Sequence, residues 1–221
     1  MNNQADLSRF EKMRRAMVAS QLRTNAVDDA RVVQAMAVVP RERYLPDGVR
    51  EIAYRDTLLP LGRGRHQNLP MATGRLLTEA RIGRDDSVLL IGAAGGYTAA
   101  VIALLAKSVT ALEVDPDLVG LAREALADVK NVEVVEGPLC AGWAVGQPYD
   151  AIIVDGAVED LPAEIVAQAR VGAHIATGIV DRGVTRLAVG ERTQGGFGLF
   201  DFADADCAIL PGFDRPKRFT F

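Results

Sequence analysis

The chain has 221 residues, of which 49% are hydrophobic and 24% charged, and its formal net charge is −4. This composition is typical of a soluble globular protein and excludes a disordered chain. A mildly acidic chain without a basic block disfavours nonspecific binding to nucleic acid. The two cysteines and two histidines fit neither a disulfide framework nor a zinc site, so we expect no bound metal.

No apolar stretch reaches the ~20 residues that a membrane helix needs, and the charged segment 1–15 does not resemble a secretory signal. We therefore expect a cytoplasmic protein with no membrane partner. At roughly 100–200 residues per domain, 1–221 is expected to form a single domain. Within it, a helical and irregular part, 1–80, precedes a more regular α/β core, 81–221.

The first third of the chain carries helical and irregular patterns. Apolar residues at near-helical spacing predict an amphipathic helix over 7–23. A second short helix is expected to begin near residues 28–29 and to end at Pro40. Prolines and glycines punctuate 46–70, which predicts an irregular segment of the kind that is often functional. Pro70 is expected in the first turn of the helix that follows.

From Ser87 onward, strand and helix patterns alternate. Short, wholly apolar runs such as 88–91 are typical of strands covered on both faces. The alternation over 87–178 predicts a doubly wound, mostly parallel sheet with right-handed crossovers. Strands are expected over 88–91, 109–114, 132–135, 151–154 and 173–177, with helices over 97–106, 116–126 and 162–169. Three late strand-like runs without clear helices between them predict an antiparallel edge: 185–189, 198–202 and 207–210.

A glycine-rich turn joins the first of these strands to its helix in the stretch 88–97. Such a turn lets a ligand approach the backbone at the carboxyl edge of a parallel sheet. The dinucleotide pattern G-x-G-x-x-G fails, because Ala94 and Tyr97 replace its second and third glycines. No Lys-Ser/Thr phosphate loop is present, which disfavours kinases and nucleoside triphosphatases. The G-x-G-x-G form of adenosylmethionine sites fits better, with Gly92 and Gly96 at its ends.

Glu113 ends the next expected strand, 21 residues after Gly92. A carboxylate at this place can accept hydrogen bonds from both ribose hydroxyls of a nucleoside cofactor. Taken alone, the turn is also compatible with a purely structural role, and the carboxylate with a solvated strand end. Together, at this spacing, they favour a nucleoside site.

Three ordered blocks resemble the protein-L-isoaspartate (D-aspartate) O-methyltransferase family. Val38–Tyr44 is similar to V-P-R-E-x-[FY], and Ala53–Gly64 to A-Y-x-D…L-P-I-G-x-G. Val88–Val101 is similar to V-L-E-I-G-x-G-S-G-Y-x-A-A-V. The resemblance implies a Rossmann-like fold of the class I adenosylmethionine-dependent methyltransferase type. It also implies that 1–80 covers the cofactor cleft of the core, 81–221.

The resemblance implies methyl transfer from S-adenosyl-L-methionine to the side-chain carboxylate of L-isoaspartyl residues, which begins the repair of damaged proteins. Isoaspartyl-containing peptides or proteins are then the expected partners. This reaction needs no general base, because an ionised carboxylate is already a nucleophile, and catalysis is mostly positioning and exclusion of water. The cofactor-binding residues that the resemblance implies are Gly92, Ala94, Gly96, Tyr97, Glu113, Pro138 and Leu139.

Several residues depart from the family's pattern. Asn68 stands in the place of the serine usually assigned to the active site, and an amide can donate to a carboxylate. Arg65, nearby, offers a bidentate fork to a carboxylate; the alternative is a solvated basic loop. Leu90 replaces a usual glutamate. Pro138 replaces an aspartate that contacts adenine, and it offers neither a carboxylate nor an N–H.

Asp155 stands where the family has a small neutral segment. Two roles are open for it, capping of the next helix or binding of a substrate amine, and we favour the cap. The departures together leave three functions open. The first is isoaspartyl carboxyl methylation, the second is methylation of a different acceptor, and the third is a non-catalytic protein that retains the fold.

Overall fold

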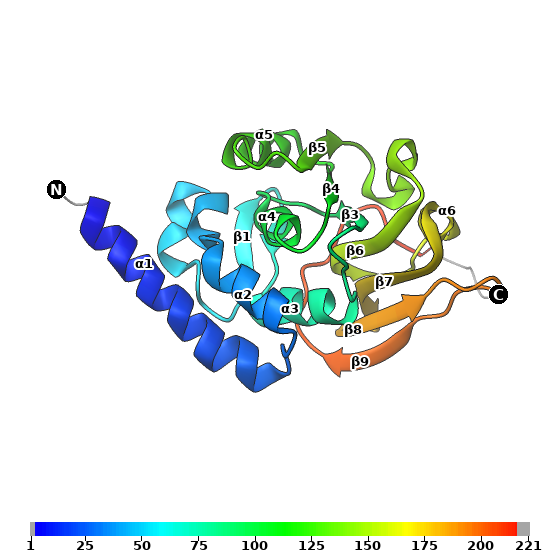
Figure 1. The fold of residues 1–221 in the computed structure, drawn as a ribbon, viewed down its shortest axis with the longest axis horizontal. Helices are drawn as coiled ribbons and strands as arrows, with labels where there is room; N and C mark the ends of the chain where they lie inside the picture. The colour runs from blue at the N-terminus through cyan, green and yellow to red at the C-terminus, as the bar shows by residue number, and fades with distance from the viewer. Residues whose placement is uncertain (1–2, 216–221) are drawn as a thin grey trace.

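The computed structural model describes residues 3–215, and a seven-stranded sheet forms its centre (Figure 1). The strand order is β5-β4-β3-β6-β7-β8-β9. The strands are β3 (Ser87–Ile91), β4 (Ser108–Glu113), β5 (Val132–Glu136), β6 (Tyr149–Val158), β7 (Ala169–Asp181), β8 (Val184–Glu191) and β9 (Phe200–Asp204). The pairs among β3 to β7 are parallel, whereas β8 and β9 add antiparallel pairs at one edge. This confirms the predicted mostly parallel sheet with an antiparallel edge.

Helices cover both faces of the sheet. α4 (Tyr97–Ala103) and α5 (Pro116–Ala125) follow β3 and β4 and belong to one apolar cluster, while α6 (Ala163–Gln168) follows β6 and belongs to the other. Because β3 lies between the two clusters, its residues from Val88 to Ile91 are all fully buried. A strand buried on both faces explains the continuous apolar run in the sequence.

The helices expected near the N-terminus are present. α1 (Asn3–Met17) continues through a π-helical turn, Val18–Leu22, and a 3₁₀ turn, Arg23–Asn25, so the helical segment spans the predicted 7–23. α2 (Ala30–Val38) begins after Asp29, whose carboxylate caps its first turn, as residue types of this kind do. α3 (Pro70–Glu79) begins with the proline in its first turn, as predicted. Figure 1 shows α2 and α3 beside α4, and α2 contacts both of the other helices.

The prediction of an irregular segment over 46–70 is wrong in part. After a 3₁₀ helix over Asp47–Ile52, the chain forms an antiparallel hairpin of β1 (Leu59–Gly62) and β2 (Arg65–Gln67). Burial alternates along β1, which is the period expected of a strand with one covered face. Pro60 lies at an exposed position of β1, Gly62 ends that strand, and Gly64 lies in the turn between the strands. Pro46 and Gly48 lie at the start of the 3₁₀ helix.

Two predictions near β6 are also wrong. β6 extends four residues beyond the expected Val154, so Asp155 lies inside the strand and does not cap α6, which begins after Pro162. The run 207–210 is not a strand. It makes one parallel bridge, because β3 ends opposite Val154 and leaves the extension of β6 with a free edge on that side.

This C-terminal segment is held by backbone hydrogen bonds to β6. Ala157 N donates to Ala208 O at 2.7 Å, and Leu210 N donates to Ala157 O at 3.0 Å. Leu210 is buried and packs in the cluster beneath β3 and β6. The segment therefore lies across the carboxyl edge of the parallel strands. Among the described residues, no helix is long and apolar enough to cross a membrane.

Candidate active site

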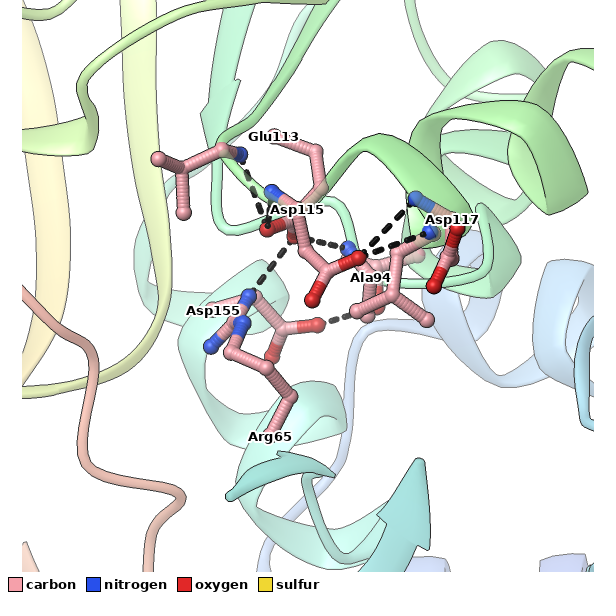
Figure 2. A network of polar contacts seen from close by, with 9 residues as sticks. Arg65, Ala94, Glu113, Asp115, Asp117 and Asp155 are labelled. Carbon is pink, nitrogen blue, oxygen red and sulfur yellow. Dashed lines mark hydrogen bonds and ion pairs between the residues drawn. The ribbon is translucent and has the colours of Figure 1, made fainter. Parts of the chain in front are cut away.

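The candidate site lies at the carboxyl edge of the sheet, where β3 has β4 on one side and β6 on the other. In an open α/β sheet such a switch point forms the crevice in which ligands bind. The segment that begins with β2 crosses this edge. Its residue Arg65 contacts the end of β4, and Asn68 contacts β6 (Figure 2 shows the first of these).

The turn after β3 is built on left-handed backbone. Gly92, Ala94 and Gly96 have φ values of 82°, 49° and 97°. Glycine adopts this region freely, whereas an alanine there is strained by about 1–2 kcal/mol. The strained residue is held by its own N–H, which donates to Glu113 Oε2 at 2.7 Å. The structure thus brings the predicted turn residues and the predicted carboxylate together.

Both oxygens of Glu113 are engaged. The side chain is fully buried. Oε2 accepts from Ala94 N and from Arg65 Nη2, the latter at 2.6 Å, while Oε1 accepts from Val114 N at 2.9 Å and Asp115 N at 3.2 Å (Figure 2). This carboxylate is therefore fixed in orientation by three backbone N–H groups and one guanidinium.

Arg65 is not a solvated loop residue. Its side chain is 5% exposed and forms an ion pair with Glu113, which is a partner that the sequence analysis did not identify. Its Nε and Nη1 atoms are buried and have no hydrogen-bond partner among residues 3–215. The second open reading of Arg65, a solvated basic loop, is therefore wrong.

Asp155 is the centre of a second buried polar group. Its Oδ1 accepts from Asn68 Nδ2 at 2.8 Å and from Thr73 Oγ1 at 3.1 Å, and its Oδ2 accepts from Thr98 Oγ1. The amide oxygen of Asn68 accepts from Ala208 N at 2.7 Å. Asn68 is thus bound at both ends of its amide. Sequence reasoning missed the two threonines. Thr73 lies in the first turn of α3 and Thr98 in the first turn of α4, and both helices begin at this edge.

Arg41 and Tyr97 lie under the same site. Arg41 is completely buried, donates from Nε to Ala53 O at 2.9 Å, donates from Nη2 to Asn68 O, and lies 4.8 Å from the centre of the Tyr97 ring. Burial lowers the pKa of Arg41, and this effect is opposed by Tyr97 and Asp155. Burial raises the pKa of Tyr97 to about 12, opposed by Arg41. The phenol therefore stays protonated at neutral pH.

Pro138 and Leu139 lie after β5, beside the end of β4. Pro138 begins a 3₁₀ turn and Leu139 is buried, while Gly137 N donates to Glu113 O at 3.0 Å. Val114, the residue after the carboxylate, is 38% exposed. This side of the edge offers apolar surface and, at Pro138, no backbone N–H.

The sheet order, the glycine-rich turn after β3 and the carboxylate at the end of β4 define an α/β protein of the adenosylmethionine-dependent methyltransferase class. The family model for protein-L-isoaspartate(D-aspartate) O-methyltransferase matches residues 12–197. The chain belongs to this family.

Curated relatives agree. One named protein-L-isoaspartate O-methyltransferase 1, from Rhodopseudomonas palustris (strain HaA2), is 36% identical over 192 residues, which is 86% of this chain and 78% of the relative. Another, named protein-L-isoaspartate O-methyltransferase, from Methanoculleus marisnigri (strain ATCC 35101 / DSM 1498 / JR1), is 36% identical over 174 residues, 78% of each chain.

Solved structures support the same fold. One titled protein-L-isoaspartate O-methyltransferase aligns with a TM-score of 0.78 at 19% identity, over 92% of this chain and 66% of that chain. A protein-L-isoaspartate O-methyltransferase of Plasmodium falciparum in complex with S-adenosyl-L-homocysteine aligns with a TM-score of 0.74 at 19% identity, over 89% and 97%. The predicted Rossmann-like fold of class I methyltransferases is thereby confirmed.

Proposed function

We propose that this chain is an S-adenosyl-L-methionine-dependent O-methyltransferase that methylates the carboxylate of L-isoaspartyl residues in damaged proteins. The observation that carries the proposal is Glu113, held by Ala94 N against the glycine-rich turn at the end of β4, in a chain of this family. Damaged, isoaspartyl-containing proteins are its proposed partners, and we place it in the cytoplasm.

The residues present fit the nucleoside of this cofactor. Glu113 has the acceptor oxygens that a ribose diol needs, and binding a ribose there requires Arg65 to give up its hydrogen bond to Oε2. Val114 offers partly exposed apolar surface to a base, whereas Leu139 is buried and Pro138 offers no N–H. Gly92 and Gly96 form this turn, and Tyr97 begins the helix that follows it. When bound, the cofactor supplies an electrophilic methyl group.

The chain's own residues position the reactants and exclude water. An ionised carboxylate needs no general base, and Tyr97, whose pKa burial raises to about 12, keeps its proton. We further propose that the N-terminal part, 1–80, closes the crevice of the core, 81–221. The carbonyl oxygen of Tyr44, in the N-terminal part, lies so close to Gly95 of the core that a Cβ at position 95 would clash with it.

A second candidate is methylation of a neutral acceptor. It is favoured by Asp155, a buried carboxylate at this edge, which would repel an anionic acceptor unless a cation such as Arg41 balances it. Asn68, the family serine's replacement, is also bound to Asp155 and Ala208 and is not free to meet a carboxylate.

Methyl transfer should be measured with radiolabelled S-adenosyl-L-methionine and two peptides that differ only in having isoaspartate or aspartate at one position. We expect label in the isoaspartyl peptide alone. If the protein binds S-adenosyl-L-homocysteine in calorimetry but labels neither peptide, the acceptor assignment is wrong. A screen of hydroxyl and amine acceptors for release of S-adenosyl-L-homocysteine then tests the second candidate.

A further inference from the structure

We propose that the buried guanidinium of Arg65 is the carboxylate-binding group of this site, and so a residue that determines which ligands the crevice accepts. The proposal deepens the proposed function and rests on it for the identity of the ligands. The carboxylate has two possible sources there, the methyl acceptor and the methionine end of the cofactor. Both offer the same chemistry to a guanidinium.

The first observation is an excess of buried donors. Arg65 is 5% exposed, and only its Nη2 has a partner in the part of the chain that the structure describes. Buried polar groups in proteins are nearly always hydrogen-bonded, and a buried charge with unused N–H groups is costly. Two such nitrogens, which carry three N–H groups, on one side chain therefore indicate a partner from outside the chain.

The second observation is that neither carboxylate of the site supplies that partner. Glu113 already accepts four hydrogen bonds, three of them from backbone N–H groups. Asp155 accepts three, from Asn68, Thr73 and Thr98. Glu113 is thus filled and Asp155 has one acceptor site left, on Oδ2, whereas two nitrogens of Arg65 have no partner among the described residues.

The third observation concerns shape and place. Nη2 carries one N–H toward Nε and one toward Nη1, and it makes a single hydrogen bond, so one of the two forks of Arg65 keeps both of its N–H groups unused. Such a fork fits the two oxygens of a carboxylate. Arg65 lies beside Glu113 at the carboxyl edge (Figure 2), three residues before Asn68, which binds Asp155. When Glu113 binds a ribose, Arg65 loses its ion pair with this carboxylate. Its buried charge is then stabilised by another carboxylate.

The other basic group of the site does not compete for this role. Arg41 also has an unpaired Nη1, but its Nε and Nη2 are held by the carbonyls of Ala53 and Asn68, and its plane covers Tyr97. Arg41 therefore fixes the segment around Asn68. Of the two arginines, only Arg65 has both its Nε and a terminal nitrogen without a partner among the described residues.

The test compares ligands that differ in one carboxylate, by isothermal titration calorimetry. S-Adenosyl-L-homocysteine is paired with 5′-methylthioadenosine, which has the nucleoside but no carboxylate. An isoaspartyl peptide is paired with its methyl ester, both titrated in the presence of S-adenosyl-L-homocysteine. The test variants are Arg65→Met and Arg65→Lys, and the control is Arg63→Met. Arg63 is an exposed arginine of the same hairpin that pairs with Asp117 at 2.5 Å.

If the acceptor is the source, Arg65→Met weakens binding of the peptide about tenfold or more and leaves its methyl ester unchanged. If the cofactor is the source, Arg65→Met weakens binding of S-adenosyl-L-homocysteine by a similar factor. It does not weaken binding of 5′-methylthioadenosine, whose ribose no longer competes with Arg65 for Glu113. In either case Arg65→Lys, which keeps the charge without the fork, gives a smaller loss, and Arg63→Met gives none.

Several outcomes overturn the proposal. Arg65 only neutralises Glu113 if Arg65→Met changes the affinity for both members of each ligand pair equally. The same holds if the change in affinity is no larger than in Arg63→Met. Tighter binding of both nucleosides means that it only competes with the ribose. A wild-type protein that binds none of the carboxylate ligands also contradicts it. Since no arm requires turnover, failure of the methylation assay is distinguishable from failure of this proposal. Thermal unfolding of Arg65→Lys checks that the fold persists.

Discussion

The side-chain amide of Asn68 donates to Asp155 Oδ1 at 2.8 Å and so joins the segment after β2 to the interior of β6. Its other end accepts from Ala208 N, 140 residues away in sequence. One side chain thereby connects three segments at the carboxyl edge of the sheet. We infer that Asn68 is a structural link in this chain.

This role predicts a large stability effect at Asn68. Asn68→Ala leaves a buried carboxylate short of one donor and a buried N–H without an acceptor, so we expect a loss of about 2–4 kcal/mol in the free energy of unfolding. Asn25→Ala, at an exposed amide that bonds only to Gln21 O and Thr24, is the control and should lose under about 1 kcal/mol. Urea denaturation measures both, and similar losses would refute the link.

Glu113→Gln tests the nucleoside site. An amide cannot accept on both sides, so one pair of the four donors now faces an NH₂ group, and a ribose loses its charged acceptor. We expect S-adenosyl-L-homocysteine and 5′-methylthioadenosine to bind about tenfold or more weakly, by about 1.5–3 kcal/mol. Glu133→Gln, exposed on β5, serves as the control in the same calorimetry. Unchanged affinity in Glu113→Gln would place the ribose elsewhere.

The local patterns of the sequence predicted what depends on neighbours along the chain. Apolar runs and their spacing located β3, β4 and α5, and the distance from Gly92 to Glu113 predicted that the glycine-rich turn and this carboxylate meet, as the Ala94–Glu113 hydrogen bond shows. These features are set by period and by turn residues within a few dozen positions.

Contacts between distant segments were not predictable in this way. Arg65 and Glu113 are 48 residues apart, and no local pattern pairs them. Asp155 resembles a helix cap in sequence because a glycine and then a helix follow it. Its real partners come from three other elements. The run 207–210 resembles a strand, but whether it pairs depends on where β3 ends opposite Val154.

Gly92 and Leu210 form a contact that a double-mutant cycle can measure. A Cβ on Gly92 would lie 2.9 Å from Leu210 Cδ1, and its φ of 82° is strained for alanine by about 1–2 kcal/mol. Leu210→Ala alone should lose about 2–4 kcal/mol of stability. We expect the double variant Gly92→Ala/Leu210→Ala to lose clearly less stability than the sum of the losses in the two single variants. The smaller side chain at position 210 makes room for the new Cβ at position 92. Additive losses in urea denaturation would mean that the contact is absent.

Alkaline pH should destabilise the fold through Cys207. Burial raises the pKa of this thiol to about 12 from an ordinary 9.0, with Asp155 adding to the shift. Above the ordinary value the unfolded chain releases this proton while the folded chain keeps it, so stability is present below pH 9 and falls as pH rises. The expected slope is about 1.4 kcal/mol per pH unit, and Tyr97 acts in the same direction above its own ordinary pKa of 10.0.

Cys207→Ala removes one of these two groups. Urea denaturation near neutral pH and near pH 10 should therefore show a smaller loss of stability in the variant than in the wild type. Parallel losses in the two proteins would show that the thiol is not the group that responds.

Pro138 predicts a gain of affinity on substitution. Its φ of −63° suits other residues, so Pro138→Ala keeps the backbone and adds an N–H at this edge of the sheet. If adenine lies there, S-adenosyl-L-homocysteine should bind up to about tenfold tighter, the equivalent of one hydrogen bond of about 1–1.4 kcal/mol. The loss of a proline should lower stability by about 0.4–1 kcal/mol through the unfolded chain. Pro162→Ala, before α6, controls for that loss in the same titration, and equal affinity in both variants would mean that adenine does not contact this backbone position.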